Sequence, residues 1–587
     1  MNASLTAQAN SPNQTSMRAW SVALRYGLIG GAVALFLALV GMVEAFATRY
    51  VIANVIDLGT LLLFLSYLGA GYVAIKRSGA RTPFEILSQG AFAGFIASVF
   101  IALLAVVIYA IPGIRTIFIN ASPALLAILT FKMGVPAGLV PILLSGVIFG
   151  AIGGLIEILP PSLRRSLIYA AMVVLVFGLM QDLLRVTLQK WKFLDPATSF
   201  TFSNNGLTIV GAVTLFILTF LASQLWQRRG NEARARYRQL PTRQQQLLGW
   251  GLIAFSVALL LVLPLLVGLF FSEVLVNVGL FILLGLGLNI VVGFAGLLDL
   301  GYVAFYAIGA YTVALLTSTS LEIVYAGGNP FWLALPFAVF FAVLAGVILG
   351  IPVLKIRGDY LAIVTLGFGE IIRLIVLSDF LKPILGGSRG IELIPKPFIG
   401  SFEFAGPEEL YYLILAGCGL AAFVAIRVKD SRLGRAWGAL REDEDVAEAM
   451  GINLVSTKLM AFAMGAAFGG LSGAIFASKL AIIYPSSFNL LLSINVLAVV
   501  IIGGMGSIPG VVLGALVLVG LPELLREFSD YRLMLYGAAL VIMMLVRPEG
   551  LWPEKSRQRE LHESQQEEIL SGPLAADEEV AREGAAG

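Results

Sequence analysis

The feature that most restricts this chain is a succession of apolar stretches, each about twenty residues long. Stretches of that length cross the hydrocarbon core of a bilayer as helices, and these lack the alternating pattern of an outer-membrane barrel strand. The 587-residue chain is 58% hydrophobic and only 13% charged, a composition that excludes a soluble globular protein. We therefore predict an all-α polytopic integral membrane protein.

The apolar stretches predict about 16 transmembrane helices in two groups. About six form the first group, near residues 26–47, 52–75, 89–111, 135–159, 166–186 and 206–226. About ten form the second group, near residues 249–270, 274–296, 300–318, 331–355, 358–378, 411–427, 459–478, 489–505, 507–526 and 532–547.

Shifts in composition divide the chain into five segments. They are a polar N-terminal segment 1–25, an N-terminal membrane extension of unknown role 26–227, a basic linker 228–248, a second membrane domain 249–553 and a polar tail 554–587. The positive charge of the linker either binds anionic lipid headgroups or serves only to set the topology, and both interpretations stay open.

Basic residues also indicate which helix ends face the cytoplasm. Lys76, Arg77 and Arg81 follow the second apolar stretch, and Arg164 and Arg165 separate the fourth stretch from the fifth. By the positive-inside rule these loops, the basic linker and both chain termini lie in the cytoplasm. About six predicted helices separate the linker from the charged segment 427–453, which places that segment in the cytoplasm as well.

Residues suited to catalysis or metal binding are scarce. The chain has one cysteine, Cys418, and one histidine, His562, so it contains no internal disulfide, zinc cluster or Ser-His or Cys-His pair in the membrane. It also lacks a Gly-x-x-x-x-Gly-Lys-Ser/Thr run and therefore an ATPase of its own. We expect no cofactor, no metal, no nucleic-acid partner and no enzymatic activity.

The charged segment 427–453 interrupts the second group of apolar stretches. It is too polar to lie in hydrocarbon, so it meets water or another protein. Trp437, Leu440, Ala447 and Met450 recur at helical spacing, which predicts the apolar face of one helix that ends at Gly451. A solvated helix without a partner is the alternative.

Glycines interrupt the apolar pattern of residues 285–311, where Asn289 and Asp299 place polar groups between two apolar runs. Broken helices of this kind expose backbone groups to a transported solute. The alternative is a tight helix–turn–helix in which Asp299 caps the following helix, and the two interpretations are compatible.

Three other patterns occur in the second membrane domain. Glu370 and Arg373 are three residues apart, which predicts an ion pair on one helix face. Glycines recur every four residues from 465 to 473 and predict a smooth face, used for static packing or for a sliding gate. The glycine-rich segment 503–510 predicts a re-entrant turn on the extracellular side or at the midplane.

These segments together resemble the bacterial branched-chain amino acid ABC transporter permeases of the larger, LivM-like type. The resemblance rests on residues 434–453, 458–462, 285–311, 356–374, 503–510 and 531–551, and covers about residues 249–553. It implies an ABC permease domain in which segment 427–453 is the cytoplasmic loop that docks on an ATPase. The coupling residues that it implies are Gly434, Arg435, Trp437, Arg441, Glu442, Glu448, Ala449, Gly451 and Asn453. The residues that it implies for the translocation path are Asn289, Gly293, Gly296, Asp299, Gly301, Tyr302, Phe305, Tyr306, Glu370 and Arg373.

The resemblance implies the remaining parts of an ATP-driven importer in the bacterial inner membrane. These are a second permease subunit, two cytoplasmic ATPase subunits and a periplasmic solute-binding protein. Leu, Ile and Val are the implied solutes, although related permeases carry urea, amides or other amino acids. Outside the resemblance, Asp57 and Asp182 keep an ion-coupled secondary transporter open, and residues 1–240 could form a scaffold or sensor.

Overall fold

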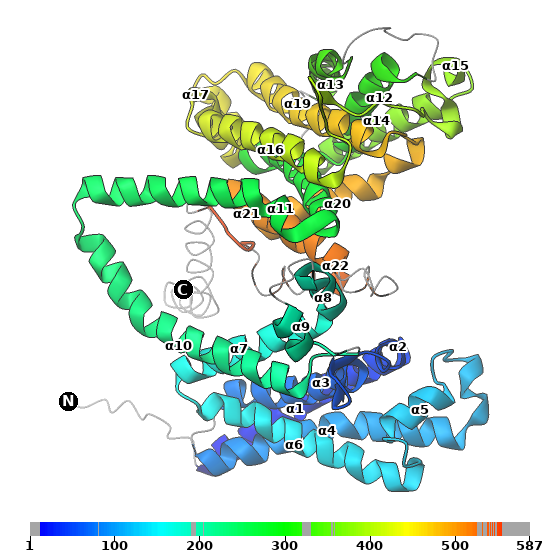
Figure 1. Cartoon of the computed structure of the whole chain (residues 1–587), viewed down its shortest axis with the longest axis vertical. Coiled ribbons are helices and arrows are strands. Elements are labelled where there is room, and N and C mark those ends of the chain that lie inside the picture. Colours follow the sequence, from blue (N-terminus) through cyan, green and yellow to red (C-terminus); the bar gives the residue numbers. More distant parts are fainter. Residues whose placement is uncertain are drawn as a thin grey trace, which may run out of the picture. The chain divides into compact units, whose positions relative to one another are not determined.

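The computed structural model describes most of the chain, in two compact units that comprise residues 1–252 and 253–587 (Figure 1). The division lies close to the end of the predicted basic linker. The described residues are 12–79, 82–189, 195–203, 205–319, 330–353, 356, 358–524, 531, 534, 537–538, 540–541, 543, 545, 547 and 549–554. The predicted polar tail therefore lies almost wholly outside the described residues.

Among the described residues, twelve helices are long and apolar enough to cross a membrane, which confirms the all-α polytopic class. They are Ala19–Leu39, Leu58–Ser78, Pro83–Ala110, Val135–Ile158, Pro161–Leu179, Ile209–Gly230, Arg243–Phe294, Phe331–Val353, Tyr360–Leu377, Pro407–Lys429, Leu454–Leu480 and Pro485–Gly503. The predicted stretch 249–270 and all but the last two residues of the stretch 274–296 lie in Arg243–Phe294, whose backbone is non-helical at Gly268 (φ 80°). Two shorter apolar helices, Val303–Thr317 and Ile508–Leu524, correspond to the predicted stretches 300–318 and 507–526.

The first unit is built from helices and one very short strand pair. Its elements are α1 (Pro12–Leu39), α2 (Met42–Phe46), β1 (Tyr50–Ile52), β2 (Ile56–Asp57), α3 (Leu58–Ser78), α4 (Pro83–Ala110), η1 (Pro112–Thr116), α5 (Pro123–Leu129), α6 (Val135–Ile158), α7 (Pro161–Leu179), α8 (Gln181–Gln189), α9 (Asp195–Thr201), α10 (Ile209–Gln239) and the start of α11 (Thr242–Leu288). The antiparallel pair of β1 and β2 was not predicted from the sequence.

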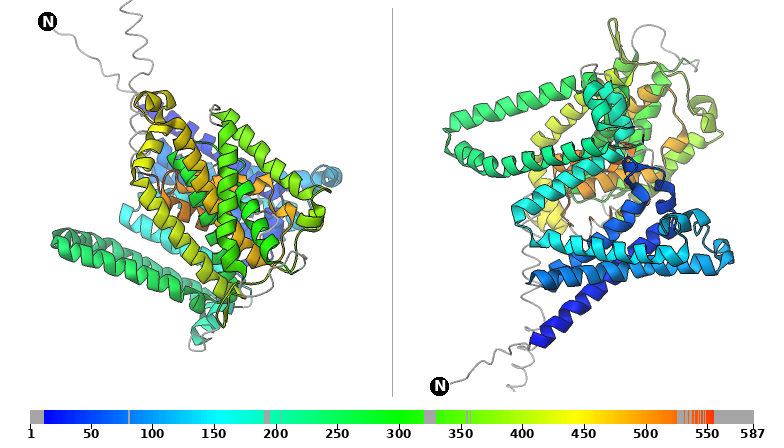
Figure 2. Two further views of the ribbon diagram at one scale, coloured as in Figure 1. Left: turned by 90° about the horizontal axis from the view of Figure 1, so that it is seen from above. Right: turned by 60° about the horizontal axis from the view of Figure 1, so that its bottom comes forward.

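Glycines bring the backbones of α3, α4 and α6 into direct contact. The ribbons of α4 and α6 run side by side in Figure 2. A Cβ added to Gly94 on α4 would lie 2.1 Å from the carbonyl oxygen of Gly146 on α6. A Cβ added to Gly71 on α3 would lie 2.2 Å from the carbonyl oxygen of Gly150. Small residues allow this close approach, which supplies packing contacts between helices that lipid would otherwise cover.

The beginning of the chain differs from the prediction in its helix bounds. Helix α1 already begins at Pro12 and ends at Leu39, whereas the sequence predicts a span over residues 26–47. Gly41, at φ 93°, separates α1 from α2, because a left-handed residue stops a helix. Residues 12–25 of the expected polar segment are therefore helical.

Asp57 caps helix α3. Its two carboxylate oxygens accept hydrogen bonds from the backbone N–H and the hydroxyl of Thr60, each at 2.7 Å. This cap satisfies a backbone donor at the start of a membrane span. Helix capping thus accounts for one of the two acidic residues that kept an ion-coupled transporter open.

The second unit has a longer succession of helices. Its elements are the rest of α11, the π-helix η3 (Asn289–Phe294), α12 (Val303–Thr317), α13 (Pro330–Val353), α14 (Asp359–Leu377), α15 (Lys382–Leu385), η4 (Gly387–Arg389), β3 (Phe398–Ile399), β4 (Phe402–Glu403), α16 (Pro407–Lys429), α17 (Arg432–Glu442), α18 (Glu444–Ala449), α19 (Leu454–Leu480), η5 (Pro485–Ser487), α20 (Leu490–Gly503), α21 (Ile508–Ala515), the π-helix η6 (Leu516–Gly520) and α22 (Leu521–Leu524).

Helix α19 is the most buried of the long apolar helices, and its glycines form a close-packed face. A Cβ added to Gly473 would lie 2.0 Å from the carbonyl oxygen of Tyr306 on α12, and one added to Gly465 would lie 2.5 Å from a methyl group of Val291. The structure therefore confirms the tight-packing interpretation of these glycines.

The turn that contains Gly506 lies at the same end of the unit as the charged segment 427–453. The Gly506 carbonyl accepts a hydrogen bond from Lys429 Nζ at 3.5 Å, and its N–H donates to Asn289 Oδ1 at 2.8 Å. Helices α19 and α20 follow one another and return the chain to the end from which α19 starts. The extracellular expectation for residues 503–510 and the cytoplasmic expectation for segment 427–453 therefore cannot both hold.

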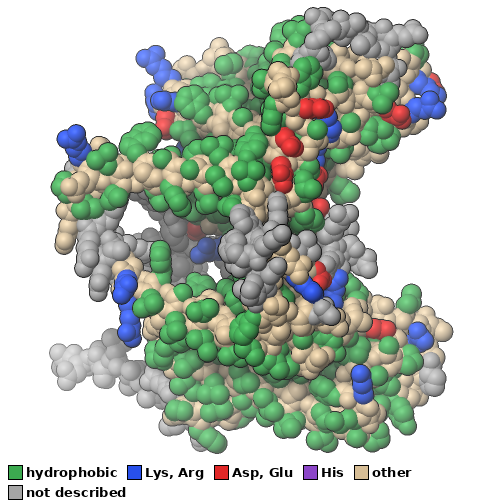
Figure 3. Space-filling model, viewed as in Figure 1, with side chains coloured by type: hydrophobic (Ala, Val, Ile, Leu, Met, Phe, Trp, Pro, Cys, Tyr) green, Lys and Arg blue, Asp and Glu red, His purple; other side chains and the backbone are tan. Residues whose placement is uncertain are grey.

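Hydrophobic side chains cover much of the described surface seen in Figure 3. Such a surface suits lipid or a membrane-embedded partner, and charged side chains gather mainly at helix ends and connections.

Candidate functional site

The charged segment folds into two short helices, α17 and α18, rather than the single helix predicted. Ser431 caps α17 by accepting from the N–H groups of Leu433 and Gly434, at 3.1 and 3.2 Å. Asp443 is extended (φ −158°, ψ 119°), which ends α17. Its carboxylate accepts from the N–H of Val446 at 2.9 Å and starts α18.

A left-handed glycine ends α18. Gly451 has φ 85°, its N–H donates to the Glu448 carbonyl at 2.9 Å, and the Ile452 N–H donates to the Ala447 carbonyl at 3.1 Å. This is a Schellman motif, in which a glycine provides the conformation that closes a helix. The predicted helix end at Gly451 is confirmed.

Two contacts attach the short helices to α19. The fully buried Trp437 donates its indole N–H to the Thr457 carbonyl at 2.9 Å. Lys458, 1% exposed, forms an ion pair with Glu444 at 2.8 Å. Thr457 and Lys458 both lie near the start of α19. These contacts therefore hold α17 and α18 against the N-terminal end of α19.

The outer side of α18 and its C-terminal turn form an exposed patch, which we call the docking patch: Val446, Glu448, Ala449, Met450 and Gly451. Met450 is 80% exposed and Val446 is 59% exposed. The assignment of Met450 to the buried helix face was wrong, because the break at Asp443 changes the helical phase. Large exposed apolar side chains next to an acidic one are typical of a protein interface.

The coupling residues implied by the sequence therefore separate by exposure. Trp437 is buried, and Gly434 and Arg441 are half-buried. The others are exposed, namely Arg435, Glu442, Glu448, Ala449, Gly451 and Asn453.

Arg441 connects the short helices to the broken segment 285–311. Its Nη1 donates to the Gly293 carbonyl at 3.0 Å, in the last turn of the π-helix η3. A Cβ added to Gly296, at φ 73°, would lie 2.7 Å from Arg441 Cγ. The glycines thus allow the arginine to contact the backbone directly.

The predicted break in segment 285–311 is present. Helix α11 passes into the π-helix η3, and a non-helical stretch over residues 295–302 precedes α12. A Cβ added to Gly293 would lie 2.1 Å from Asn289 Oδ1. With Asn289 in this position, residue 293 has room only for glycine. Asn289 is buried, and its Oδ1 accepts from the Gly506 N–H.

Asp299 lies fully buried in the non-helical stretch. Its Oδ1 accepts from the Gly301 N–H at 2.9 Å, so Asp299 closes this turn and does not cap α12. Burial raises the pKa of Asp299 from 3.8 to about 7, and the hydrogen bond from the Gly301 N–H acts in the opposite direction. The Thr365 hydroxyl donates its hydrogen to the Ala362 carbonyl, so Gly301 is the donor that matters here.

Helices α14, α19 and α20 fix the start of α12. The Val303 N–H donates to Ser493 Oγ at 3.0 Å, and the Tyr302 hydroxyl donates to the Gly465 carbonyl at 2.7 Å. The Leu300 N–H donates to Thr365 Oγ1 at 3.0 Å. The break is therefore held by side chains of α14 and α20 and by a backbone carbonyl of α19.

The residues implied for the translocation path occupy two environments. Most are buried inside this unit: Asn289, Gly293, Asp299, Gly301, Tyr302, Phe305 and Tyr306, whereas Gly296 is exposed. Glu370 and Arg373 form the predicted ion pair on α14, with Arg373 Nε donating to Glu370 Oε2 at 2.9 Å and the side chains 44% and 30% exposed.

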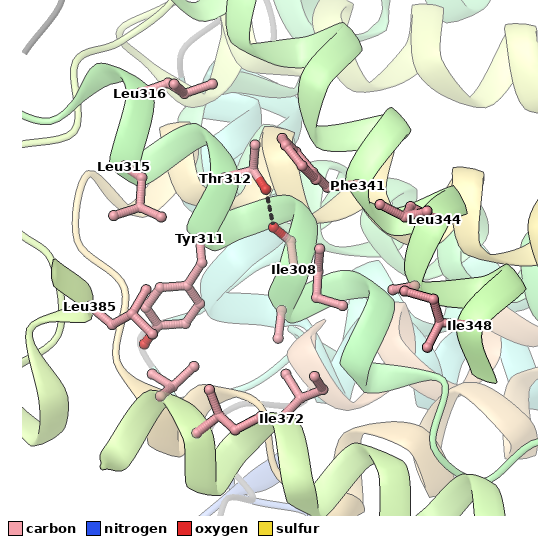
Figure 4. A pocket seen from close by; sticks show the side chains of 14 residues that line it. Ile308, Tyr311, Thr312, Leu315, Leu316, Phe341, Leu344, Ile348, Ile372 and Leu385 are labelled. Carbon is pink, nitrogen blue, oxygen red and sulfur yellow. Dashed lines mark hydrogen bonds between the residues drawn. The ribbon is translucent and has the colours of Figure 1, made fainter. Parts of the chain in front are cut away.

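A cavity of about 420 Å³ lies between α12, α13, α14 and α15. Figure 4 shows its apolar lining, which includes Ile308, Tyr311, Phe341 and Ile372. No residue implied for the path lines this cavity in the described part of the chain.

Two site residues escaped the sequence reasoning. Lys429, at the end of α16, forms an ion pair with Glu554 at 2.5 Å and also reaches the Gly506 carbonyl. Glu554 was expected to begin a solvated tail. The two paired residues lie far apart in the chain, so the sequence showed their opposite charges but not their contact.

Two short helices lie on a bundle of apolar spans and contact a broken helix, an arrangement that suits a membrane transport protein. The family model of the branched-chain amino acid transport system / permease component matches residues 270–544. The chain belongs to this family, as its similarity to individual members also shows.

The LivM high-affinity branched-chain amino acid permease of Escherichia coli K12 is 45% identical over 296 residues, which cover 46% of this chain and 68% of that protein. LivM of Salmonella typhimurium is 44% identical over 308 residues, which cover 49% and 70%. BraD of Pseudomonas aeruginosa is 26% identical over 286 residues, which cover 46% and 90%. No solved structure matches.

Proposed function

We propose that this chain is a permease subunit of an ATP-driven importer that carries branched-chain amino acids across the bacterial inner membrane. Family membership supports the class of transporter, and relatives named as branched-chain amino acid permeases support the solutes. ATP hydrolysis belongs to separate ATPase chains.

The contact between Arg441 and the Gly293 carbonyl is the observation that carries the proposed mechanism. An ATPase bound at the docking patch moves α18, and the Lys458–Glu444 ion pair passes this movement to α19. Arg441 passes it to the π-helix η3. Short π-helical segments such as η3 are frequent at functional sites. The pore then switches between outward-facing and inward-facing states.

The remaining partners are a second permease subunit and a periplasmic solute-binding protein. The exposed side of α14, which carries Glu370 and Arg373, faces the path or the second permease. Charged groups inside membrane spans are costly and face protein or water, which supports this placement. Residues buried around the break act by supporting the path helices. Both chain termini and the docking patch lie in the cytoplasm.

Purification of the full chain with its partners tests the proposal. The unaltered chain, expressed with the ATPases and the second permease in a mild detergent, is expected to retain the ATPases. In the variant Glu448→Arg with Met450→Glu, the amount of ATPase that copurifies is expected to fall at least about tenfold. The docking patch then has an altered charge pattern and lacks its large apolar side chain.

Asp379→Arg is the matched control, because Asp379 is exposed and follows α14 at the opposite end of the unit from α17 and α18. The control is expected to retain the ATPases. Equal ATPase retention by the docking variant and the unaltered chain would overturn the assignment of the docking patch. Absence of any ATPase from the unaltered complex would overturn the importer itself.

A further inference from the structure

A cavity of about 740 Å³ with a mixed polar and apolar lining lies between α7 and α10 in the first unit. Its lining includes two arginines and two aromatic residues, Arg165, Arg228, Tyr169 and Trp226. The family model begins at residue 270, so the importer function does not account for this cavity.

The cavity lies where two membrane spans end. The span of α7 begins at Pro161 and the span of α10 ends at Gly230, and both residues are close in sequence to the arginines. Lipid phosphates occupy this depth of a bilayer, and Trp and Tyr are enriched there. By the positive-inside rule, the arginines place the cavity in the cytoplasmic leaflet.

Side-chain hydrogen bonds fix the walls of the cavity. Ser166 Oγ donates to Ser223 Oγ at 2.9 Å, and Gln227 Nε2 donates to Ser166 Oγ at 3.1 Å. Gln224 Nε2 donates to the Ser162 carbonyl at 3.4 Å. These bonds join α7 to α10 beside the arginines, so the cavity belongs to a defined helix pair.

The arginines differ from their neighbour Arg164 in charge balance. Arg164 forms an ion pair with Glu157 at 2.6 Å. Within the described residues no carboxylate pairs with Arg165 or Arg228. Two guanidinium groups in one cavity attract an anion, and their planar donors match the oxygens of a phosphate.

We propose that this cavity binds the phosphate group of an anionic phospholipid from the cytoplasmic leaflet. Arg165 and Arg228 bind the phosphate oxygens, while Trp226 and Tyr169 contact the glycerol and upper acyl region. The proposal concerns the first unit and does not rest on the proposed transport of amino acids.

Native mass spectrometry of the complete complex tests the proposal. The complex is reconstituted in nanodiscs of phosphatidylcholine with phosphatidylglycerol and released gently, and retained phosphatidylglycerol is counted. Arg165→Gln with Arg228→Gln is expected to weaken retention about 25-fold, which is about fivefold for each basic residue.

The double variant Arg229→Gln with Arg243→Gln is the matched control. It removes the same charge from exposed positions that do not line the cavity. Retention close to that of the unaltered chain is expected. Equal losses in both double variants would overturn the proposal, because general surface charge would then explain the binding.

A second arm adds glycerol phosphate and inorganic phosphate at millimolar concentration. Phosphatidylglycerol is expected to stay bound, since its acyl chains add apolar contacts that these anions lack. Displacement by either anion would overturn the lipid as the ligand. Absence of retained phosphatidylglycerol from an intact, unaltered complex would overturn the site.

Discussion

Gly301 is a position where the space for one side chain is already filled. A Cβ at Gly301 would lie 1.7 Å from the Thr365 carbonyl oxygen, so α14 would have to move away from the turn. We expect Gly301→Ala to destabilise the unit by about 1–3 kcal/mol, the usual cost of overpacking. Thermal unfolding in detergent measures the effect.

Gly367→Ala is the control on α14, because nothing lies within 4 Å of its added Cβ. It is expected to leave the unfolding temperature unchanged or slightly raised. Similar losses in both variants would contradict the contact between Gly301 and Thr365.

Asp299 predicts a pH dependence of stability. Its folded pKa of about 7 exceeds the ordinary 3.8, so the folded chain binds more protons between these values. Its contribution to stability therefore falls as the pH rises from about 4 to about 7, by no more than about 4 kcal/mol. Asp299→Asn is expected to flatten the dependence of the unfolding temperature on pH. An unchanged slope in this range would contradict a buried, titrating Asp299.

Residue spacing predicted some of these features and missed others. The Glu370–Arg373 pair and the glycine at the end of α18 depend on neighbours within one helical turn, so the sequence was sufficient. The pairing of Lys429 with Glu554 joins residues far apart in the chain. The exposure of Met450 depends on the break at Asp443, which caps α18. Residue spacing alone does not distinguish a helix-capping aspartate from an ordinary surface charge.

At the scale of helices, the attachment of α18 to α19 depends on a buried ion pair. Lys458→Met is expected to destabilise the unit by about 3–5 kcal/mol, because the Glu444 carboxylate then loses the ammonium group with which it pairs. Lys458→Met with Glu444→Gln is expected to cost less than this single change. Thermal unfolding of the single and double variants measures the difference. A double variant less stable than Lys458→Met would contradict this pairing.

The long helices were predicted well because each is a run of apolar residues whose length alone is diagnostic. The short helices were not, since α17 and α18 together resemble one amphipathic helix until their caps are identified. The strand pair β1–β2 comprises three and two residues, too few to show a period of two. Element type was thus predictable where length carried the information.

At the scale of the molecule, the two compact units predict separable roles. The family model matches residues 270–544, and the second unit has a continuous core of its own. A chain that begins at residue 241, just before α11, is expected to reach the membrane, bind the ATPases and retain amino-acid uptake. Radiolabelled leucine uptake, normalised to the amount of membrane-inserted chain, measures this. Loss of uptake with normal insertion and ATPase binding would show that the first unit completes the transport path.

The glycine contacts of α3, α4 and α6 have a consequence for genetic experiments. Where the carbonyl of one helix touches the Cα of the next, even alanine needs the helices to separate. A saturation-mutagenesis screen would therefore score Gly71, Gly94 and Gly150 as intolerant as any functional residue. Their loss-of-function phenotypes would come from reduced protein abundance, so such a screen needs a parallel measure of the amount of chain in the membrane.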